Sequence, residues 1–349
     1  EQGGAEQSLL RLVTADSELH HTVICVGAHT PLAQKMIDAG VSVHFVPASL
    51  PGLWRMRKLL AELAPDIVQG WMYYGNLLAS LLTPRKSRNR VVWNVRSENR
   101  GQLSVRIRLC IWLAGFCRPA TVIYNSVAGQ RSHGRFAHLS SCVIQNGIDT
   151  ELYRPDPLAR KSTRATLQID DRTCLIGLVG RFHADKGLHE FLNLALKLPA
   201  PEHQLVLVGR GMQPDNQALK SIMATVGVRE DQVLLLGERN DLPALYPALD
   251  VLVVSSYREG LPNVLLEAMA CGVAVAGTQV GDVARVIEDR ARVCAAGDAE
   301  ALAEVVGYTI ARRGEFADRD RQRILDGYDS ERCQQAYMQL YRHLADKIS

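Results

Sequence analysis

The chain has 349 residues, of which 47% are hydrophobic and 22% are charged, the ordinary composition of a globular protein. Its length predicts two domains of roughly 150–200 residues. No run approaches the roughly 20 consecutive apolar residues that a membrane-spanning helix needs, and no signal peptide is visible. The net charge of +3 is uneven: residues 1–150 carry 16 Lys and Arg against 9 Asp and Glu, whereas residues 151–349 carry 24 against 28.

The first half of the chain alternates apolar runs typical of buried strands with helical stretches, which indicates a parallel α/β protein. The predicted strands are residues 22–26, 41–46, 67–69, 91–95, 121–124 and 142–144. The predicted helices are residues 5–13, 32–39, 53–63, 77–82, 104–116 and 127–136.

The alternation restarts in the second half, which predicts a second doubly wound domain. Its predicted strands are residues 175–179, 204–208, 233–236, 251–255, 273–276 and 292–294. The boundary is placed near residues 146–155, because Asn-Gly is a turn signal and two prolines stiffen the segment after it. A last helix at residues 330–345 has apolar residues at near-helical spacing. In such sheets ligands bind at the carboxyl ends of the strands.

None of the eight cysteines belongs to a Cys-x-x-Cys pair. Because they are scattered through predicted strands and helices, we expect reduced, buried side chains in a cytosolic protein. They are Cys25, Cys110, Cys117, Cys142, Cys174, Cys271, Cys294 and Cys333.

The most informative segment reads REGLPNVLLEAMACG, residues 258–272. It follows a predicted buried strand, and we expect Pro262 to be the first residue of a helix that Gly272 ends. Glu259 then lies in the loop before the helix, and Glu267 lies two turns inside it. A helix start presents unpaired N–H groups and a positive dipole end, so an anion can bind there. Two carboxylates beside an anion site suit a nucleotide sugar, which carries both phosphate and hydroxyl groups.

This segment resembles the signature of the retaining glycosyltransferases of family 4, which have the GT-B fold and carry two glutamates separated by seven residues. The resemblance extends over nearly the whole chain, with the motifs in the family's order. The matching segments are Gly3-Gly4-Ala5-Glu6 at the N-terminal Gly-Gly loop, PDIVQGWMY at residues 65–73, Asn146-Gly147-Ile148-Asp149 with Tyr153-Arg154-Pro155 at the interdomain crossover, and GRFHADKG at residues 180–187.

The resemblance implies two doubly wound, parallel-sheet (Rossmann-like) domains that face each other across a cleft. Residues 1–150 would form the acceptor-binding domain, residues 151–328 the nucleotide-sugar-binding domain, and residues 329–349 a helix that crosses back toward the first domain. In the family the Gly-Gly loop follows an opening strand, for which Gly3 leaves no room. We expect that the natural chain starts earlier, because a sheet without its central strand would leave backbone groups unpaired.

Arg181 and Lys186 follow the predicted strand at residues 175–179, at its ligand-facing end. A guanidinium fork and a point charge can clasp a diphosphate. Taken alone, the two residues could be ordinary surface charges. The resemblance implies instead that both neutralise the leaving nucleoside diphosphate, with Gly180 beside them. It also implies that Glu259 takes part in catalysis by binding the hydroxyls of the donor sugar, rather than facing solvent.

The resemblance assigns the remaining donor contacts as well. The N–H groups of Gly260 and Leu261 would lie near the phosphates. Glu267 would accept the ribose diol; the alternative is a salt bridge, because a buried charge rarely lacks a partner. Arg239 would stack on the base, unless its segment is a plain surface turn. Gly4 would let the N-domain loop approach the donor phosphates closely.

The chain departs from the family after the fourth predicted strand of the first half. Many members carry a histidine there, where this chain reads WNVRSE, so a histidine general base cannot be carried over. Asn94, Arg96 and Glu98 are the candidates for contacts to the acceptor or the sugar. We interpret His133 as a structural histidine. Gly281-Asp282 and Ala284 replace the more usual Gly-Gly and Pro, with no evident catalytic consequence.

Neither a metal nor another cofactor is expected. No Asp-x-Asp carboxylate motif ends a strand in a metal-like setting, and the histidine spacing offers no zinc site. Basic residues would stabilise the leaving group in place of a metal cation.

The sequence therefore predicts a retaining glycosyltransferase that uses a UDP-sugar, or secondly a GDP-sugar, and transfers the sugar to a glycan or lipid-linked acceptor in surface polysaccharide biosynthesis. One alternative is a non-hydrolysing nucleotide-sugar epimerase, which resembles the same fold. The other is a non-catalytic nucleotide-sugar-binding protein, because the usual histidine is missing. Sugar transfer, epimer formation or binding alone would separate the three.

The basic character of the first half concentrates in residues 55–135, which carry 14 basic and 3 acidic residues. Such a stretch is often a solvated face, but apolar residues are interleaved with the charges at residues 103–113. This pattern favours an anionic membrane surface or a lipid-linked acceptor, and we expect a cytoplasmic protein at the inner face of the plasma membrane. No motif for binding nucleic acid is present.

Overall fold

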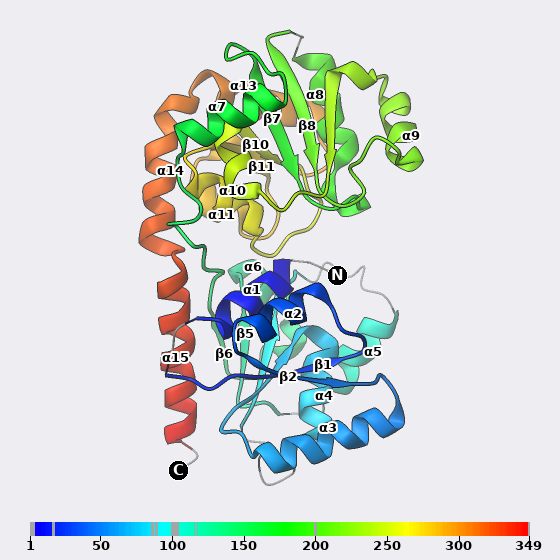
Figure 1. Cartoon of the computed structure of the whole chain (residues 1–349), viewed down its shortest axis with the longest axis vertical. Coiled ribbons are helices and arrows are strands. Elements are labelled where there is room, and N and C mark those ends of the chain that lie inside the picture. The colour runs from blue at the N-terminus through cyan, green and yellow to red at the C-terminus, as the bar shows by residue number, and fades with distance from the viewer. Residues whose placement is uncertain are drawn as a thin grey trace. The chain divides into compact units, whose positions relative to one another are not determined.

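The computed structural model describes residues 4–15, 18–84, 87, 90–98, 105–114, 116, 118–198 and 201–347. The chain divides into two compact units (Figure 1). Unit 1 comprises Glu1–Gly147 and Ser330–Ser349, and unit 2 comprises Ile148–Asp329. Each unit contains parallel strands covered by helices, so the predicted α/β class is confirmed.

Unit 2 contains one six-stranded parallel sheet in the order β12-β11-β10-β7-β8-β9. The chain winds outward from β7 in one direction and from β10 in the other, which is the doubly wound order. Ligands bind such sheets where the order reverses, here between β7 and β10. The strands are β7 Cys174–Val179, β8 His203–Val208, β9 Val233–Gly237, β10 Val251–Val254, β11 Ala274–Thr278 and β12 Val293–Cys294.

Two hydrophobic clusters cover the two faces of this sheet. Along β7, Leu175 and Val179 belong to one cluster, whereas Ile176 and Leu178 belong to the other. Alternate residues of a strand point to opposite faces, so a strand buried on both faces is apolar throughout. The covering helices are α7 Pro157–Thr166, α8 Leu188–Lys197, α9 Gln217–Val226, α10 Leu242–Leu245, α11 Asn263–Ala270, α12 Val283–Ile287, α13 Ala299–Ala311 and α14 Arg313–Gly327.

The described strands of unit 1 form two parallel sheets, β1-β2 and β3-β4-β5-β6, and no described strand joins β1 to β3. The strands are β1 Thr22–Val26, β2 Ser42–Val46, β3 Val68–Trp71, β4 Val91–Val95, β5 Thr121–Tyr124 and β6 Ser141–Val143. The helices are α1 Gly4–Val13, α2 Pro31–Asp38, α3 Leu50–Leu63, α4 Met72–Leu82, α5 Val105–Ala114, α6 Val127–Ser132 and α15 Ser330–Asp346.

The C-terminal helix α15 packs on unit 1 through side chains with specific partners. Tyr337 accepts a 2.8 Å hydrogen bond from Asn94 Nδ2, and Tyr341 donates a 2.6 Å hydrogen bond to Gln69 Oε1. Both tyrosines also belong to a hydrophobic cluster with residues of β4 and β5. Two polar contacts and an apolar face thus fix the helix against the sheet.

The single helix predicted at residues 127–136 is wrong, because α6 ends at Ser132 and a 3-10 turn follows. His133 lies at the break and is buried. Its Nδ1 contacts Gly129 O at 2.7 Å and its Nε2 contacts the Tyr73 hydroxyl at 2.8 Å, while burial lowers the pKa of the ring. Both ring nitrogens have protein partners, which confirms the interpretation of a structural histidine.

Two further expectations concern cysteines and membrane spans. The seven described cysteines are free thiols. None of the described helices combines the length and the apolar character that crossing a bilayer requires.

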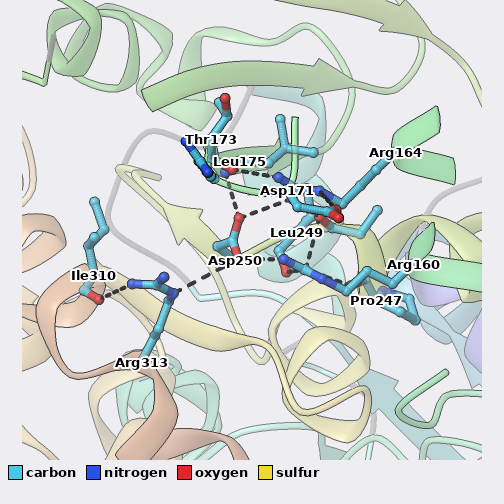
Figure 2. Close-up of polar contacts among 12 residues, drawn as sticks. Arg160, Arg164, Asp171, Thr173, Leu175, Pro247, Leu249, Asp250, Ile310 and Arg313 are labelled. Carbon is cyan, nitrogen blue, oxygen red and sulfur yellow. Dashed lines mark hydrogen bonds and ion pairs between the residues drawn. The ribbon is translucent and has the colours of Figure 1, made fainter. Parts of the chain in front are cut away.

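The carboxylate of Asp250, whose side chain is 9% exposed, fixes the amino end of β10 (Figure 2). It accepts hydrogen bonds from Arg160 Nη2 at 2.8 Å, Arg164 Nη1 at 3.1 Å and the Leu175 N–H at 2.7 Å. Arg160 Nη1 also donates to the carbonyl oxygens of residues 247–249. One carboxylate and two arginines therefore tie α7 to the starts of β7 and β10.

Removing this carboxylate should destabilise unit 2 strongly. Asp250→Ala leaves the buried Arg164 guanidinium without its main counterion, which costs about 3–5 kcal/mol. Urea denaturation followed by circular dichroism measures the loss. Asp171→Ala is the control: Asp171 is almost fully exposed and lies 3.8 Å from Arg164 Nε, so its loss should cost less than about 1 kcal/mol. Equal stability of the two variants would contradict the structural role of Asp250.

Candidate functional site

Two loops meet where β7 and β10 end, at the point where the sheet order reverses. The 180–187 loop contains a 3-10 turn, Ala184–Lys186, and the 255–261 loop leads toward α11. Lys186 Nζ lies 2.7 Å from Glu259 Oε1, and the two side chains are 22% and 14% exposed. A partly buried ion pair therefore joins the loops directly, in reach of a ligand.

Other contacts hold the same two loops together. Arg258 Nη2 lies 2.7 Å from both carboxylate oxygens of Asp185, and its Nε lies 3.1 Å from one of them. The Tyr257 N–H donates to Asp185 O at 2.7 Å, and Ser255 Oγ donates to Lys186 O at 2.8 Å. Side-chain and backbone hydrogen bonds together therefore hold the two loops against each other.

Two glycines permit this close approach. Gly187 has a φ of +60°, and a Cβ there would lie 2.0 Å from Ser255 O. Gly281 has a φ of +54°, and a Cβ there would lie 2.2 Å from Gly260 O, which also accepts a 2.8 Å hydrogen bond from the Asp282 N–H. Gly281 thus supports the 255–261 loop.

Glu190 and Tyr257 form a further link that sequence reasoning missed. Glu190 lies buried in the first turn of α8, and the Tyr257 hydroxyl donates to its Oε1. This hydrogen bond, with burial, raises the pKa of Tyr257 to about 12. A lone carboxylate in the apolar sequence of α8 was the available signal, the same kind of signal that identified Glu267.

The helix after the 255–261 loop begins one residue later than predicted. Pro262 is its N-cap, with φ −73° and ψ 123°, and the first helical residue is Asn263. Glu267 is the fifth residue of the helix, about one turn from its start. A start at Pro262 would place it only about one and a half turns inside, so the predicted depth of two turns is wrong for either start. It is 7% exposed and accepts a 2.8 Å hydrogen bond from the Tyr246 hydroxyl. Burial and the neighbouring carboxylate raise the pKa of Tyr246 well above its ordinary value.

The other predicted donor residues lie at the same edge of the sheet. Gly180 directly follows β7, and its N–H donates to Val208 O at 2.8 Å. Arg181 is exposed and has no ion-pair partner within the described part of the chain. Arg239 follows β9 and forks onto Asp241, which lowers the pKa of that carboxyl. Arg181 is therefore available to a ligand, whereas Arg239 shares its charge with Asp241.

In unit 1 the predicted acceptor residues differ in accessibility. Asn94 is completely buried: its backbone pairs with the Asn76 amide and its own amide donates to Tyr337. Arg96 is partly buried, donates to Asn146 Oδ1 and stacks over the Trp71 ring at 5.1 Å.

Burial lowers the pKa of Arg96. Glu98 is half-buried, and Gly4 is the first residue of α1. Arg96 and Glu98 thus keep exposed surface at the end of β4, and Asn94 does not. Among the described residues, no three His, Cys, Asp or Glu side chains gather as a metal-binding group would.

Comparison with known proteins places these features in a family. The model of "Glycosyltransferase Family 4" matches residues 2–152, and the model of "Glycosyl transferases group 1" matches residues 173–311. The two matches cover most of both units in the order the sequence predicts. The chain belongs to the family 4 glycosyltransferases, and its fold is GT-B.

Two curated relatives are enzymes of lipopolysaccharide core biosynthesis. The mannosyltransferase LpsB of Rhizobium meliloti is 30% identical over 52% of this chain and 54% of its own length. The mannosyltransferase LpcC of Rhizobium leguminosarum is 29% identical over 67% of this chain and 72% of its own length. The chain therefore spans about half of the first relative and about three-quarters of the second.

A solved structure supports the fold over almost the full chain. Anabaena HepE in complex with UDP-glucose superposes with a TM-score of 0.85 at 20% identity, covering 98% of this chain and 97% of HepE.

Alanine at Gly281 should cost more stability than a positive φ alone explains. Gly281→Ala forces a Cβ against a backbone carbonyl, whereas Gly227, with φ +87°, has open space at that position. Gly227→Ala should lose roughly 1–2 kcal/mol, the cost of a left-handed residue, and Gly281→Ala should lose clearly more. Thermal unfolding of both variants measures the difference, and equal losses would argue against a close contact at Gly281.

Proposed function

We propose that this protein is a retaining glycosyltransferase. It moves a sugar from a nucleoside diphosphate sugar, with UDP-sugar as the first choice and GDP-sugar as the second, to a glycan or lipid-linked acceptor in surface polysaccharide biosynthesis. The observation that carries the proposal is the contact of Lys186 with Glu259 where the sheet order reverses. The lipopolysaccharide mannosyltransferases among its relatives support the acceptor class, and the HepE complex supports UDP.

The proposed reaction separates charge onto the leaving diphosphate. The acceptor hydroxyl oxygen bonds to the anomeric carbon on the face from which the diphosphate departs, and the bond from that carbon to the phosphate oxygen breaks. The diphosphate takes the acceptor proton. Arg181 and Lys186 stabilise the charge that develops on the diphosphate, so no metal ion is required for this step.

The remaining donor contacts follow from the arrangement of the loops. Glu259 holds hydroxyls of the transferred sugar, and the N–H groups of Gly260 and Leu261 face the phosphates. Glu267 accepts the ribose hydroxyls, in competition with or beside its bond from Tyr246. Arg239 contacts the base while Asp241 keeps its guanidinium in one orientation.

The proposed acceptor contacts lie in unit 1. Arg96 and Glu98 are the candidates with exposed surface, and Asn94 would act only by fixing β4. Gly4 at the start of α1 is proposed to lie near the donor phosphates. These assignments depend on the family resemblance.

Incubation with radiolabelled UDP- and GDP-sugars tests the class of reaction. Transfer to an added glycan or lipid-linked acceptor, or slow release of free sugar, supports the proposal. Formation of the epimeric nucleotide sugar would support the epimerase instead, and tight binding without turnover would support a non-catalytic binding protein.

Arg181 and Lys186, called the diphosphate clasp here, should both be needed for turnover. Arg181→Ala and Lys186→Ala each remove a charge-assisted contact to the leaving group, which should cost about 2–4 kcal/mol of transition-state stabilisation. Steady-state kinetics of sugar transfer measure the effect. Lys197→Ala is the control, because Lys197 ends α8 and pairs with Glu300 away from the loops. Turnover near that of the unmodified protein in both clasp variants would remove the assignment.

We also propose that unit 1 binds the anionic inner face of the plasma membrane. Trp112 of helix α5 and Phe116 just after it are 47% and 73% exposed, on the same stretch as the exposed Arg106 and Arg108. Helix α3 similarly exposes Trp54 next to several basic residues. Apolar anchors among cations suit an anionic bilayer. Arg85, Lys86, Arg88 and Arg100 of the same basic stretch lie outside the described residues.

Flotation with liposomes tests membrane binding. Each basic residue near an anionic bilayer contributes roughly 1 kcal/mol, and the attraction fades beyond a Debye length. Flotation should therefore require anionic lipid and weaken with salt. The double variant Arg106→Glu/Arg108→Glu should lose it, whereas Leu158→Ser, which removes an exposed leucine of unit 2, should not. Equal flotation on neutral and anionic vesicles would contradict the electrostatic mechanism.

A further inference from the structure

We propose that Ser256 is a positioning residue for Glu259 and thereby fixes the carboxylate that holds the transferred sugar. This inference rests on the proposed function. Ser256 Oγ donates a 2.8 Å hydrogen bond to Glu259 Oε1, the same oxygen that contacts Lys186 Nζ at 2.7 Å. Within the described chain, Oε2 of this carboxylate receives no hydrogen bond. One oxygen is thus anchored twice, and the other is left for a ligand.

The anchoring hydroxyl is itself held in place. Ser256 is 2% exposed, and its carbonyl oxygen accepts a 2.6 Å hydrogen bond from the buried Thr278 hydroxyl at the end of β11. The next residue donates its N–H to Asp185 O at 2.7 Å. Backbone contacts on both sides therefore set the position of the Ser256 side chain independently of any ligand.

The two anchors of Glu259 differ in what a ligand can do to them. Lys186 is charged and 22% exposed, so a diphosphate attracts it and competes with Glu259 for it. Ser256 is neutral and almost completely buried, so a ligand cannot reach its hydroxyl. As the diphosphate draws Lys186 away, Ser256 keeps Oε1 in place and Oε2 stays directed toward the sugar hydroxyls.

A serine with a purely structural role would affect UDP affinity and sugar transfer together, whereas Ser256 is expected to affect only the sugar-dependent steps. Removing the hydroxyl should leave the nucleoside diphosphate contacts intact but let the carboxylate rotate. A catalytic geometry displaced by about 1 Å can cost roughly 100-fold in rate. The sugar-dependent part of donor binding and kcat should therefore fall, while affinity for UDP itself should not.

The experiment compares Ser256→Ala with the unmodified protein. Calorimetry measures the Kd values of UDP and GDP and of UDP-glucose and GDP-mannose, and labelled donors report kcat. In Ser256→Ala we expect kcat to fall roughly 10- to 100-fold, the extra affinity of the nucleotide sugar to be lost, and the Kd of UDP or GDP to change less than about twofold. Thr309→Val, which removes another buried hydroxyl, one bonded to Val305 O, should change neither kcat nor binding.

A second background shows whether Ser256 acts through Glu259. In Glu259→Ala, the further change Ser256→Ala should not alter the ratio of nucleotide-sugar to nucleotide affinity, because two residues that act through one group are not additive. An equal effect in both backgrounds, or normal kcat in Ser256→Ala beside an active unmodified protein, overturns this inference alone. If the unmodified protein neither turns over nor prefers any nucleotide sugar over its nucleotide, the proposed function falls as well.

Discussion

The ion pair of Lys186 and Glu259 spans the ends of β7 and β10, neighbouring strands from which the chain winds in opposite directions. In a doubly wound sheet the loops after these strands diverge at this point and leave a crevice. Here polar contacts draw the two loops together over part of it. Gly187 and Gly281 are required because backbone carbonyls then lie within 2.0–2.2 Å of where a Cβ would stand. The order of the strands thus sets where the site lies. The close approach of the loops at the site in turn requires glycine at positions 187 and 281.

Strands β4 and β5 could be predicted because they are buried along their whole length. A continuous apolar run leaves little choice of boundary, and the predicted β4 and β5 have the bounds that the structure shows. The first residues of helices were harder to predict from the sequence. Proline has no N–H to donate, so it suits both the N-cap and the first helical position, and sequence pattern does not distinguish them at Pro262. The prediction placed the start one residue early, which changes the position of Glu267 relative to the helix start by about 100° of rotation.

Residues whose role depends on distant partners could not be predicted. Asn94 follows the pattern of a polar residue at a strand end, yet its amide partner, Tyr337, is 243 positions away in the sequence. Gly281 matters because of the carbonyl of Gly260, which belongs to another loop. The sequence around a residue indicates which contacts its side chain can make, but the partner is known only from the folded structure. Glu259 and Glu267 could be identified from the sequence because they lie only eight positions apart in one segment.

The charge of unit 2 also differs between the whole domain and the candidate site. The second half of the chain carries more acidic than basic residues, which alone argues against an anion site. At the carboxyl edge of the sheet, however, Asp185 and Asp241 each pair with an arginine, Arg258 and Arg239. Within each pair the negative charge of the aspartate is balanced by the positive charge of the arginine.

Arg181 remains exposed, and within the described residues the Lys186 ammonium contacts only Glu259, the carboxylate that is proposed to hold the sugar. Since salt screens charges beyond about 8–10 Å, these few groups set the potential that a diphosphate meets. The net charge of the domain does not. A site for an anion can therefore lie in an acidic domain, provided that the acidic side chains around it already have partners of their own.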